Sequence, residues 1–137
     1  MASRSQLVEE VIRPALEAGK TVVCDRYLLA NIVYQGHAGG LDPADIRKVG
    51  EVTVGGLMPD LTFVFDVPVG LALTRMSREL DRMESQGIEY MQRVRNGFLT
   101  EIKDYTARTV VIDARGDMES IQMEVIKHAA QLLTTTN

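Results

Sequence analysis

The 137-residue chain is 45% apolar and 25% charged, and its net charge at pH 7 is -4. These values are ordinary for a globular protein, and we expect residues 1–137 to form a single domain. The negative charge argues against broad binding to nucleic acid or acidic membranes. No apolar stretch approaches the roughly 20 residues that a membrane-spanning helix needs. We therefore expect neither nucleic acid nor membrane as a partner.

The chain contains one cysteine, Cys24, so an internal disulfide is excluded. This fits a reducing compartment, and the first residues lack the apolar core of a signal peptide, so we expect a cytoplasmic protein. Cys24 lies at the end of an apolar run. We expect it to be a small buried core residue.

Three short apolar runs predict β-strands, at residues 21–25, 61–67 and 109–114. None alternates with polar residues, which is typical of a parallel sheet covered on both faces. The sequence therefore predicts a parallel sheet with Asp25, Asp66 and Asp113 near the carboxyl ends of its strands.

Helical patterns fill the gaps between these runs. Apolar residues at helical spacing predict a first helix over residues 7–16, bent by Pro14 and ended by Gly19. Asp42 followed by a proline predicts the start of a second helix, which runs toward residue 57. Further helices are predicted at 68–85, 88–106 and 118–133. Alternation of this kind indicates a layered α/β domain with right-handed crossovers.

Gly19-Lys20-Thr21 has the ending of a phosphate-binding loop, Gly-x-x-x-x-Gly-Lys-Thr, but the chain has Pro14 where that motif needs glycine. The motif also runs from a strand into a helix, so that backbone N–H groups at the helix start hold phosphate. Here a predicted helix precedes a predicted strand. The sequence therefore predicts no phosphate-binding loop at this place.

Polar and charged side chains follow the first predicted strand directly, in the segment Asp25-Arg26-Tyr27-Leu28-Leu29-Ala30-Asn31-Ile32-Val33-Tyr34-Gln35-Gly36. In an open parallel sheet, ligands bind beyond the carboxyl ends of the strands. Arg26 suits a phosphate group there, because a guanidinium can donate two parallel hydrogen bonds. Taken alone, the Asp-Arg pair is a weak signal, because such a pair is more often an ordinary local ion pair.

The whole segment resembles the Asp-Arg-Tyr region of bacterial thymidylate kinases. Other segments resemble the same family in the same order: residues 2–14, 59–62, 65–67, 79–84, 93–95 and 111–114. The resemblance covers essentially the whole chain, which looks like the C-terminal two-thirds of such an enzyme. It implies a partial three-layer α/β fold of the phosphate-loop kinase type, with parallel strands covered by helices and the first strands missing.

The resemblance implies roles for three charged residues. Arg26 matches the arginine that binds the phosphate of thymidylate (dTMP), and Arg4 matches the arginine that hydrogen-bonds the thymine carbonyl. Asp25 would lie near the phosphates and a magnesium ion. Each residue also has a simpler interpretation: Arg4 as a surface charge near the N-terminus, and Asp25 as a partner that only orients Arg26.

Three uncharged residues match the same binding site. Asn31 aligns with a residue that reads the base edge, Gln35 with a polar neighbour of the base, and Tyr34 with a tyrosine that disfavours a 2′-hydroxyl. The simpler alternatives are a helix cap for Asn31, core packing for Tyr34 and a solvated loop for Gln35. Ala30 departs from the family, which often has serine at this place.

Arg75, Arg78 and Arg82 have the spacing i, i+3, i+7 and would form one stripe on a helix. Such a stripe can simply be a solvated surface, or it can clamp a transferring phosphoryl group. The resemblance places these arginines in a lid at about residues 74–88, which is shorter here than in relatives, and implies that they are catalytic.

The activity that the resemblance implies is phosphorylation of dTMP to dTDP, with ATP as donor, Mg²⁺ as cofactor and a homodimer as the assembly. We expect the 137-residue chain by itself to be inactive, because it has no phosphate-binding loop. Two alternatives stay open. One is a non-catalytic remnant that binds thymidylate or dimerises, and the other is a kinase for a different nucleoside monophosphate.

Overall fold

The computed structural model describes residues 1–75, 87–105 and 107–135. It divides into two compact units, Met1–Met58 and Pro59–Asn137, which are described separately here. Nothing in this division tests the expectation of a single domain, which stays a prediction. The predicted lid at about residues 74–88 falls almost entirely outside the described residues.

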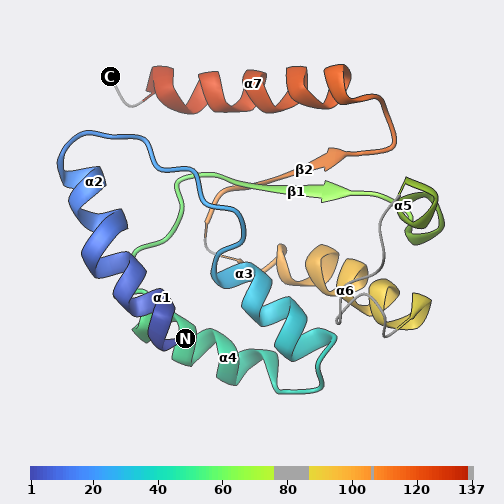
Figure 1. Cartoon of the computed structure of the whole chain (residues 1–137), viewed down its shortest axis with the longest axis horizontal. Helices are drawn as coiled ribbons and strands as arrows, with labels where there is room; N and C mark the ends of the chain where they lie inside the picture. Colours follow the sequence, from blue (N-terminus) through green and yellow to red (C-terminus); the bar gives the residue numbers. More distant parts are fainter. Residues whose placement is uncertain (76–86, 106, 136–137) are drawn as a thin grey trace. The chain divides into compact units, whose positions relative to one another are not determined.

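The first unit begins with a helical run made of α1 (Ala2–Leu7), a π-helical turn η1 (Val8–Ile12) and α2 (Arg13–Glu17) (Figure 1). The wide turn is closed by the Arg13 N–H, which donates to the Val8 carbonyl. Pro14 explains this turn, since proline has no N–H to donate and its ring crowds the carbonyl four residues earlier. The run ends before Gly19, whose φ of +73° suits glycine, as the sequence predicts.

The residues predicted as the first strand do not form one. Thr21–Cys24 have no regular secondary structure, and the only sheet in the described part of the chain consists of two other strands. An apolar segment becomes a strand only when its backbone groups pair with a neighbour. The prediction that Cys24 is buried is also wrong, since it is exposed, and neighbouring Val23 is 93% exposed.

A second helical run follows, α3 (Leu28–Asn31) continuing into η2 (Ile32–His37), and then α4 (Pro43–Thr53). The Asp42 carboxylate caps α4 by accepting from the Ala44 N–H at 2.8 Å, as predicted. In the middle of α4, Gly50 allows close approach: a Cβ there would lie 2.1 Å from Leu28 Cδ1. This contact packs α4 against α3. The largest fully buried side chains of the unit are Val8, Leu28, Ile32, Val33 and Val54.

The second unit is built on two parallel strands, β1 (Thr62–Asp66) and β2 (Thr109–Asp113). Their register pairs Thr62 with Thr109 and Asp66 with Asp113, so two aspartates end the pair side by side. Both strands and their parallel direction were predicted from the sequence. Helices cover the strand pair, as expected; Ile112 is buried, while Phe65 is 52% exposed.

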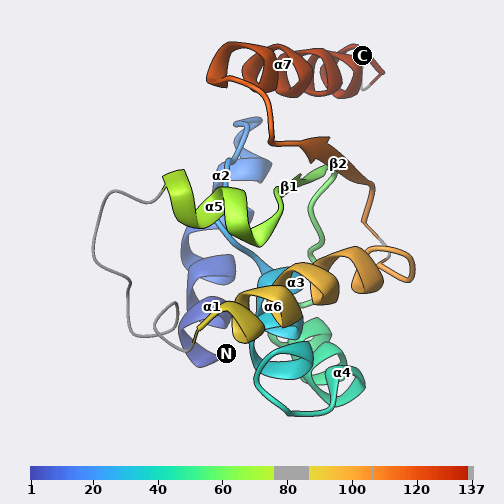
Figure 2. The ribbon, with the colours of Figure 1, turned by 90° about the vertical axis from the view of Figure 1, so that its right-hand side faces the viewer.

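Among the described residues of this unit, three helices accompany the sheet: α5 (Val69–Arg75), α6 (Ile88–Glu101) and α7 (Met118–Thr135). In both views α7 and α6 lie on opposite sides of the strand pair (Figures 1 and 2). Parallel strands with helical connections confirm the expected α/β class. Among the described helices, none combines the length and the hydrophobicity needed to span a lipid bilayer.

Candidate functional site

Arg26 is the centre of a cluster in the first unit. Its φ of +66° is unusual for a residue with a side chain, and Arg26 lies just before α3. Its exposed guanidinium faces the ring of Tyr34, with the central carbon 5.2 Å from the ring centroid. A cation held against an aromatic face is stabilised and still presents its N–H groups at the edge. Strain of this kind is common at ligand sites.

Arg4 joins the same cluster from α1. Its guanidinium carbon lies 5.1 Å from the centroid of the Tyr27 ring, and one of its N–H groups donates to the Arg26 carbonyl at 3.5 Å. The Cys24 thiol donates to the same carbonyl at 3.4 Å. The backbone bend at Arg26 therefore connects the two arginines that were predicted to bind one ligand.

Two amide side chains lie one helical turn apart in the second run. The Asn31 Nδ2 group donates to Gln35 Oε1 at 3.3 Å. The Oδ1 atom of Asn31 is buried, and no described residue donates to it. A buried acceptor without a donor costs free energy, so this oxygen is suited to a ligand that brings an N–H group. The structure does not use Asn31 as a helix cap, because it lies where α3 continues into η2.

The predicted acceptor-site residues thus fall into one unit and mostly touch each other. Arg26 contacts Tyr34, Arg4 contacts the Arg26 backbone, and Asn31 contacts Gln35. Asp25 is exposed beside this cluster in the sequence, at the bend before Arg26. Two cations, an aromatic ring and an unsatisfied amide oxygen together could bind a phosphate at one end and a polar ring at the other.

In the second unit, the carboxyl ends of both strands carry ion pairs. Arg95 binds Asp66 with two hydrogen bonds, from Nε to Oδ1 at 2.6 Å and from Nη2 to Oδ2 at 2.9 Å. These bonds hold the pKa of Asp66 below its usual value. Asp113 is bound in a similar way by Arg115, whose side-chain and backbone hydrogen bonds lower the pKa of Asp113 to about 2. Both carboxylates are therefore ionised at neutral pH.

Arg75 is the one predicted lid arginine that the structure describes, and Arg78 and Arg82 lie outside the described residues. Arg75 ends α5 and donates to three successive carbonyls after β2: Ala114 at 2.5 Å, Arg115 at 2.6 Å and Gly116 at 3.2 Å. These contacts connect the end of α5 to the loop that leads into α7.

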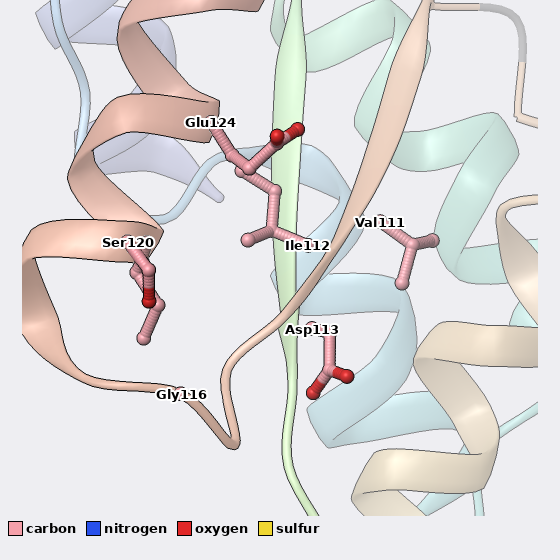
Figure 3. Close-up of a pocket in the computed structure, with 7 residues that line it drawn as sticks. Val111, Ile112, Asp113, Gly116, Ser120 and Glu124 are labelled. Carbon is pink, nitrogen blue, oxygen red and sulfur yellow. The ribbon is translucent and has the colours of Figure 1, made fainter.

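A shallow cavity of about 350 Å³ lies between β2 and the start of α7 (Figure 3). The carboxylates of Asp113 and Glu124 take part in its lining, which is unfavourable for a phosphate group. We therefore do not expect the phosphates of a nucleotide in this cavity. The lining residues are Val111, Ile112, Asp113, Gly116, Ser120, Ile121 and Glu124.

Comparison with known proteins places the chain in a family. A family model described as thymidylate kinase matches residues 1–125. The thymidylate kinase of Exiguobacterium sp. is 46% identical over 134 residues, covering 96% of this chain and 63% of that protein. That of Rhodopirellula baltica is 44% identical over 121 residues (88% and 49%), and that of Kosmotoga olearia is 41% identical over 129 residues (93% and 62%). The chain thus spans between 49% and 63% of the length of these relatives.

The parallel strands and their helices define the chain as an α/β protein, and the match to the family model shows the family within that class. The chain belongs to the thymidylate kinase family, because the family model covers 125 of its 137 residues. This confirms the family predicted from the Asp-Arg-Tyr segment and its neighbours.

Two relationships were not predicted from the sequence. Tyr27 contacts Arg4 and also donates its hydroxyl to the Leu57 carbonyl at 3.1 Å. An aromatic residue directly after Arg26 is the only local signal for this role. The pairing of Asp66 with Arg95 joins residues 29 positions apart, so no local pattern could indicate it.

Proposed function

We propose that this chain carries the thymidylate-binding part of an enzyme that transfers a phosphoryl group from ATP to dTMP, giving dTDP. One observation carries the proposal: Arg4 donates to the backbone of Arg26, whose own side chain faces Tyr34. Three residues that the family resemblance assigns to one ligand are thereby neighbours within one compact unit.

At the phosphate end, Arg26 is the proposed anchor. Its guanidinium is exposed, so it can reach a dianion in solvent. Its contact with the Tyr34 ring already restricts the side-chain orientations of Arg26, so less rotamer freedom is lost when the phosphate binds. Two parallel N–H donors match two phosphate oxygens. Tyr34 is proposed to lie near the sugar and to disfavour a 2′-hydroxyl.

At the base end, Asn31 and Arg4 are the proposed readers, with Gln35 holding the Asn31 amide. Thymine has an N–H donor at N3 and a carbonyl at C4. The first would satisfy the buried Oδ1 of Asn31, and the second would accept from Arg4. Cytosine has an acceptor and an amino group at these two places, so both contacts would be mismatched.

Mg²⁺ is proposed to bind at Asp25, since this ion is usually held by one or two carboxylates together with substrate phosphates and water. It would neutralise charge on the phosphates. Among the described residues no group of three or more His, Cys, Asp or Glu side chains could hold a metal alone.

The 137 residues offer no phosphate-binding loop for the phosphoryl donor, ATP. Gly19 ends a helix, and the sequence contains no complete phosphate-loop motif.

The lid arginines Arg75, Arg78 and Arg82 are proposed to supply the positive charge that stabilises the transferring group. Arg75 would act indirectly, because its described hydrogen bonds go to backbone carbonyls.

A cytoplasmic location is proposed from the single free cysteine. A homodimer is proposed from the family, and sedimentation showing only monomer over a wide concentration range would contradict it.

By themselves, the 137 residues carry the acceptor-site residues but no complete phosphate-loop motif, so a second candidate function for this stretch alone is binding of thymidylate without catalysis. Both candidates share the acceptor site, and they differ only in whether phosphoryl transfer follows binding. The other alternative, a kinase for a different nucleoside monophosphate, is tested by the base preference described below.

Calorimetric titration of the chain with thymidylate and with thymidine tests the phosphate anchor. Arg26→Ala should weaken thymidylate binding about 10- to 100-fold, because a charge-assisted pair contributes roughly 1.5–3 kcal/mol. Binding of thymidine, which has no phosphate, should be unchanged. Lys20→Ala removes another exposed cation of the same unit and is the matched control. If Arg26→Ala and Lys20→Ala behave alike, the proposed anchor is wrong.

A further inference from the structure

Tyr27 makes two contacts that join separate parts of the first unit. Its ring lies against the Arg4 guanidinium, with 5.1 Å between the guanidinium carbon and the ring centroid. Its hydroxyl donates to the carbonyl oxygen of Leu57 at 3.1 Å, in the turn after α4. Residues at positions 4, 27 and 57 are therefore held by one side chain.

The surroundings of Tyr27 fix its ring. It is half-buried, and burial is the main cause that raises the pKa of its hydroxyl, while the nearby charge of Arg4 opposes the shift. Its own carbonyl accepts from the Ala30 N–H at 3.2 Å, at the start of α3. A ring anchored at its backbone and at its hydroxyl has little freedom to turn. It is therefore a rigid surface for a long, flexible arginine.

Arg4 has few other restraints. It lies in α1, and its one described side-chain hydrogen bond, to the Arg26 carbonyl, is long, at 3.5 Å. An arginine loses rotamer freedom when it binds, and a pre-formed contact removes part of that cost. The stacking on Tyr27 is the contact that can do this.

We propose that Tyr27 is a positioning residue for base recognition: it holds Arg4 in the orientation that reads the base, without touching the ligand itself. This rests on the proposed thymidylate site. The proposal adds that base preference depends on a residue whose hydroxyl hydrogen is already donated to the Leu57 carbonyl.

Three variants separate this role from a general effect on folding. Tyr27→Leu removes the aromatic face, Tyr27→Phe keeps the face and removes the hydroxyl, and Arg4→Ala removes the reader. The readout is the ratio of dissociation constants for cytidylate and thymidylate, measured by calorimetry on the 137-residue chain. If Tyr27 had a purely structural role, its substitution would weaken the binding of both nucleotides equally and leave the ratio of dissociation constants unchanged.

Tyr27→Leu should lower the ratio roughly 5- to 30-fold, which corresponds to about 1–2 kcal/mol. Arg4→Ala should lower it at least as much, and the double variant should be no worse than Arg4→Ala. Combined with Arg26→Ala, the effect of Tyr27→Leu should persist unchanged, because Arg26 is assigned to the phosphate. Tyr27→Phe should keep the ratio within about twofold of the parent while lowering the melting temperature.

Nuclear magnetic resonance gives a readout that needs no ligand. It still tests the proposal if the Tyr27→Leu variant does not fold. In the parent and in Tyr27→Phe, the side-chain protons of Arg4 should be shifted by the ring current of the aromatic face. Absence of that shift in the folded parent overturns the positioning role, whatever the nucleotides do. If the parent prefers thymidylate but Tyr27→Leu keeps the full preference, the positioning role alone is wrong. If the parent binds neither nucleotide, both it and the proposed function fail.

Discussion

The guanidinium of Arg75, at the end of α5, donates a 2.5 Å hydrogen bond to the carbonyl oxygen of Ala114, directly after β2. Two further bonds reach the carbonyls of Arg115 and Gly116. One side chain therefore satisfies three successive backbone acceptors. The spacing with Arg78 and Arg82 predicts a cationic stripe, whereas the contacts of Arg75 indicate support for a loop.

Loss of Arg75 should loosen that loop. Arg75→Ala leaves three carbonyls without this donor, so the backbone amides of Arg115 and Ser120, which bond to Asp113 and Asp117, should exchange faster with solvent deuterium. Arg75→Lys should recover only part of the protection, since an ammonium cannot reproduce a planar fork of donors. Arg108→Ala, which removes an exposed arginine from the same unit, is the control and should change nothing. Equal exchange in all variants would contradict the support role.

The Asp66–Arg95 pair should make stability depend on pH. The pKa of Asp66 is lowered in the folded chain, so the pair stabilises the fold above the unfolded pKa of about 3.9 and is lost as pH falls through the folded pKa. Asp66→Asn should cost about 1–2 kcal/mol at pH 7. The difference in the free energy of unfolding between parent and variant, measured by urea unfolding, should become smaller below about pH 4. Glu124→Gln, in an exposed pair with Lys127, is the control and should cost little. A gap that is constant with pH would show that the pair does not titrate as described.

Gly50 should be essential for packing α4 against α3. A Cβ at this position would lie 2.1 Å from Leu28 Cδ1, which no ordinary contact allows. Gly50→Ala should therefore lower the free energy of unfolding by about 1–3 kcal/mol, despite the better helix propensity of alanine. Gly70 in α5 has no atom within 4 Å of a built Cβ, so Gly70→Ala should be neutral or stabilising by up to about 1 kcal/mol. Similar effects at both glycines would contradict the packing explanation.

The 137-residue chain should not transfer phosphate from ATP to thymidylate at a useful rate. Phosphoryl transfer depends on positioning and electrostatic stabilisation of the phosphates, and the chain has no complete motif for holding those of ATP. A coupled assay with purified chain, ATP, Mg²⁺ and thymidylate checks this. Turnover that survives repeated purification would contradict the expectation and favour the catalytic candidate over the binding remnant.

The strand pair of the second unit could be predicted from sequence because its signal is local. Residues 61–67 and 109–114 are continuous apolar runs, and each is flanked by helical patterns. Residues 21–25 carry the same pattern, yet they form no strand in the structure. Apolar composition favours an extended backbone, but pairing depends on a partner that the pattern does not specify.

The helical run from Leu28 to His37 was missed in the assignment of elements, although its signal was present. Leu28, Leu29, Ile32 and Val33 have the helical spacing i, i+1, i+4, i+5, and all four are buried. Two features hid it: Tyr27 is not a usual capping residue, and Gly36 suggests a break.

For the candidate site, the sequence predicts a set of residues but not their contacts. Arg4 and Arg26 were named separately, whereas the structure connects them through the Arg26 carbonyl. The placement of Tyr27 between Arg4 and Leu57 depends on packing of three segments and has no sequence signature. The roles of these residues toward a ligand stay predictions.

The central claim is that the first unit binds thymidylate and recognises its base. Calorimetric titration of the parent chain with thymidylate and, separately, with cytidylate tests it most directly. We predict saturable binding of thymidylate, at least about tenfold tighter than that of cytidylate, since the buried Asn31 oxygen and Arg4 match only thymine. Equal affinity for the two nucleotides, or no binding of thymidylate, would contradict the account.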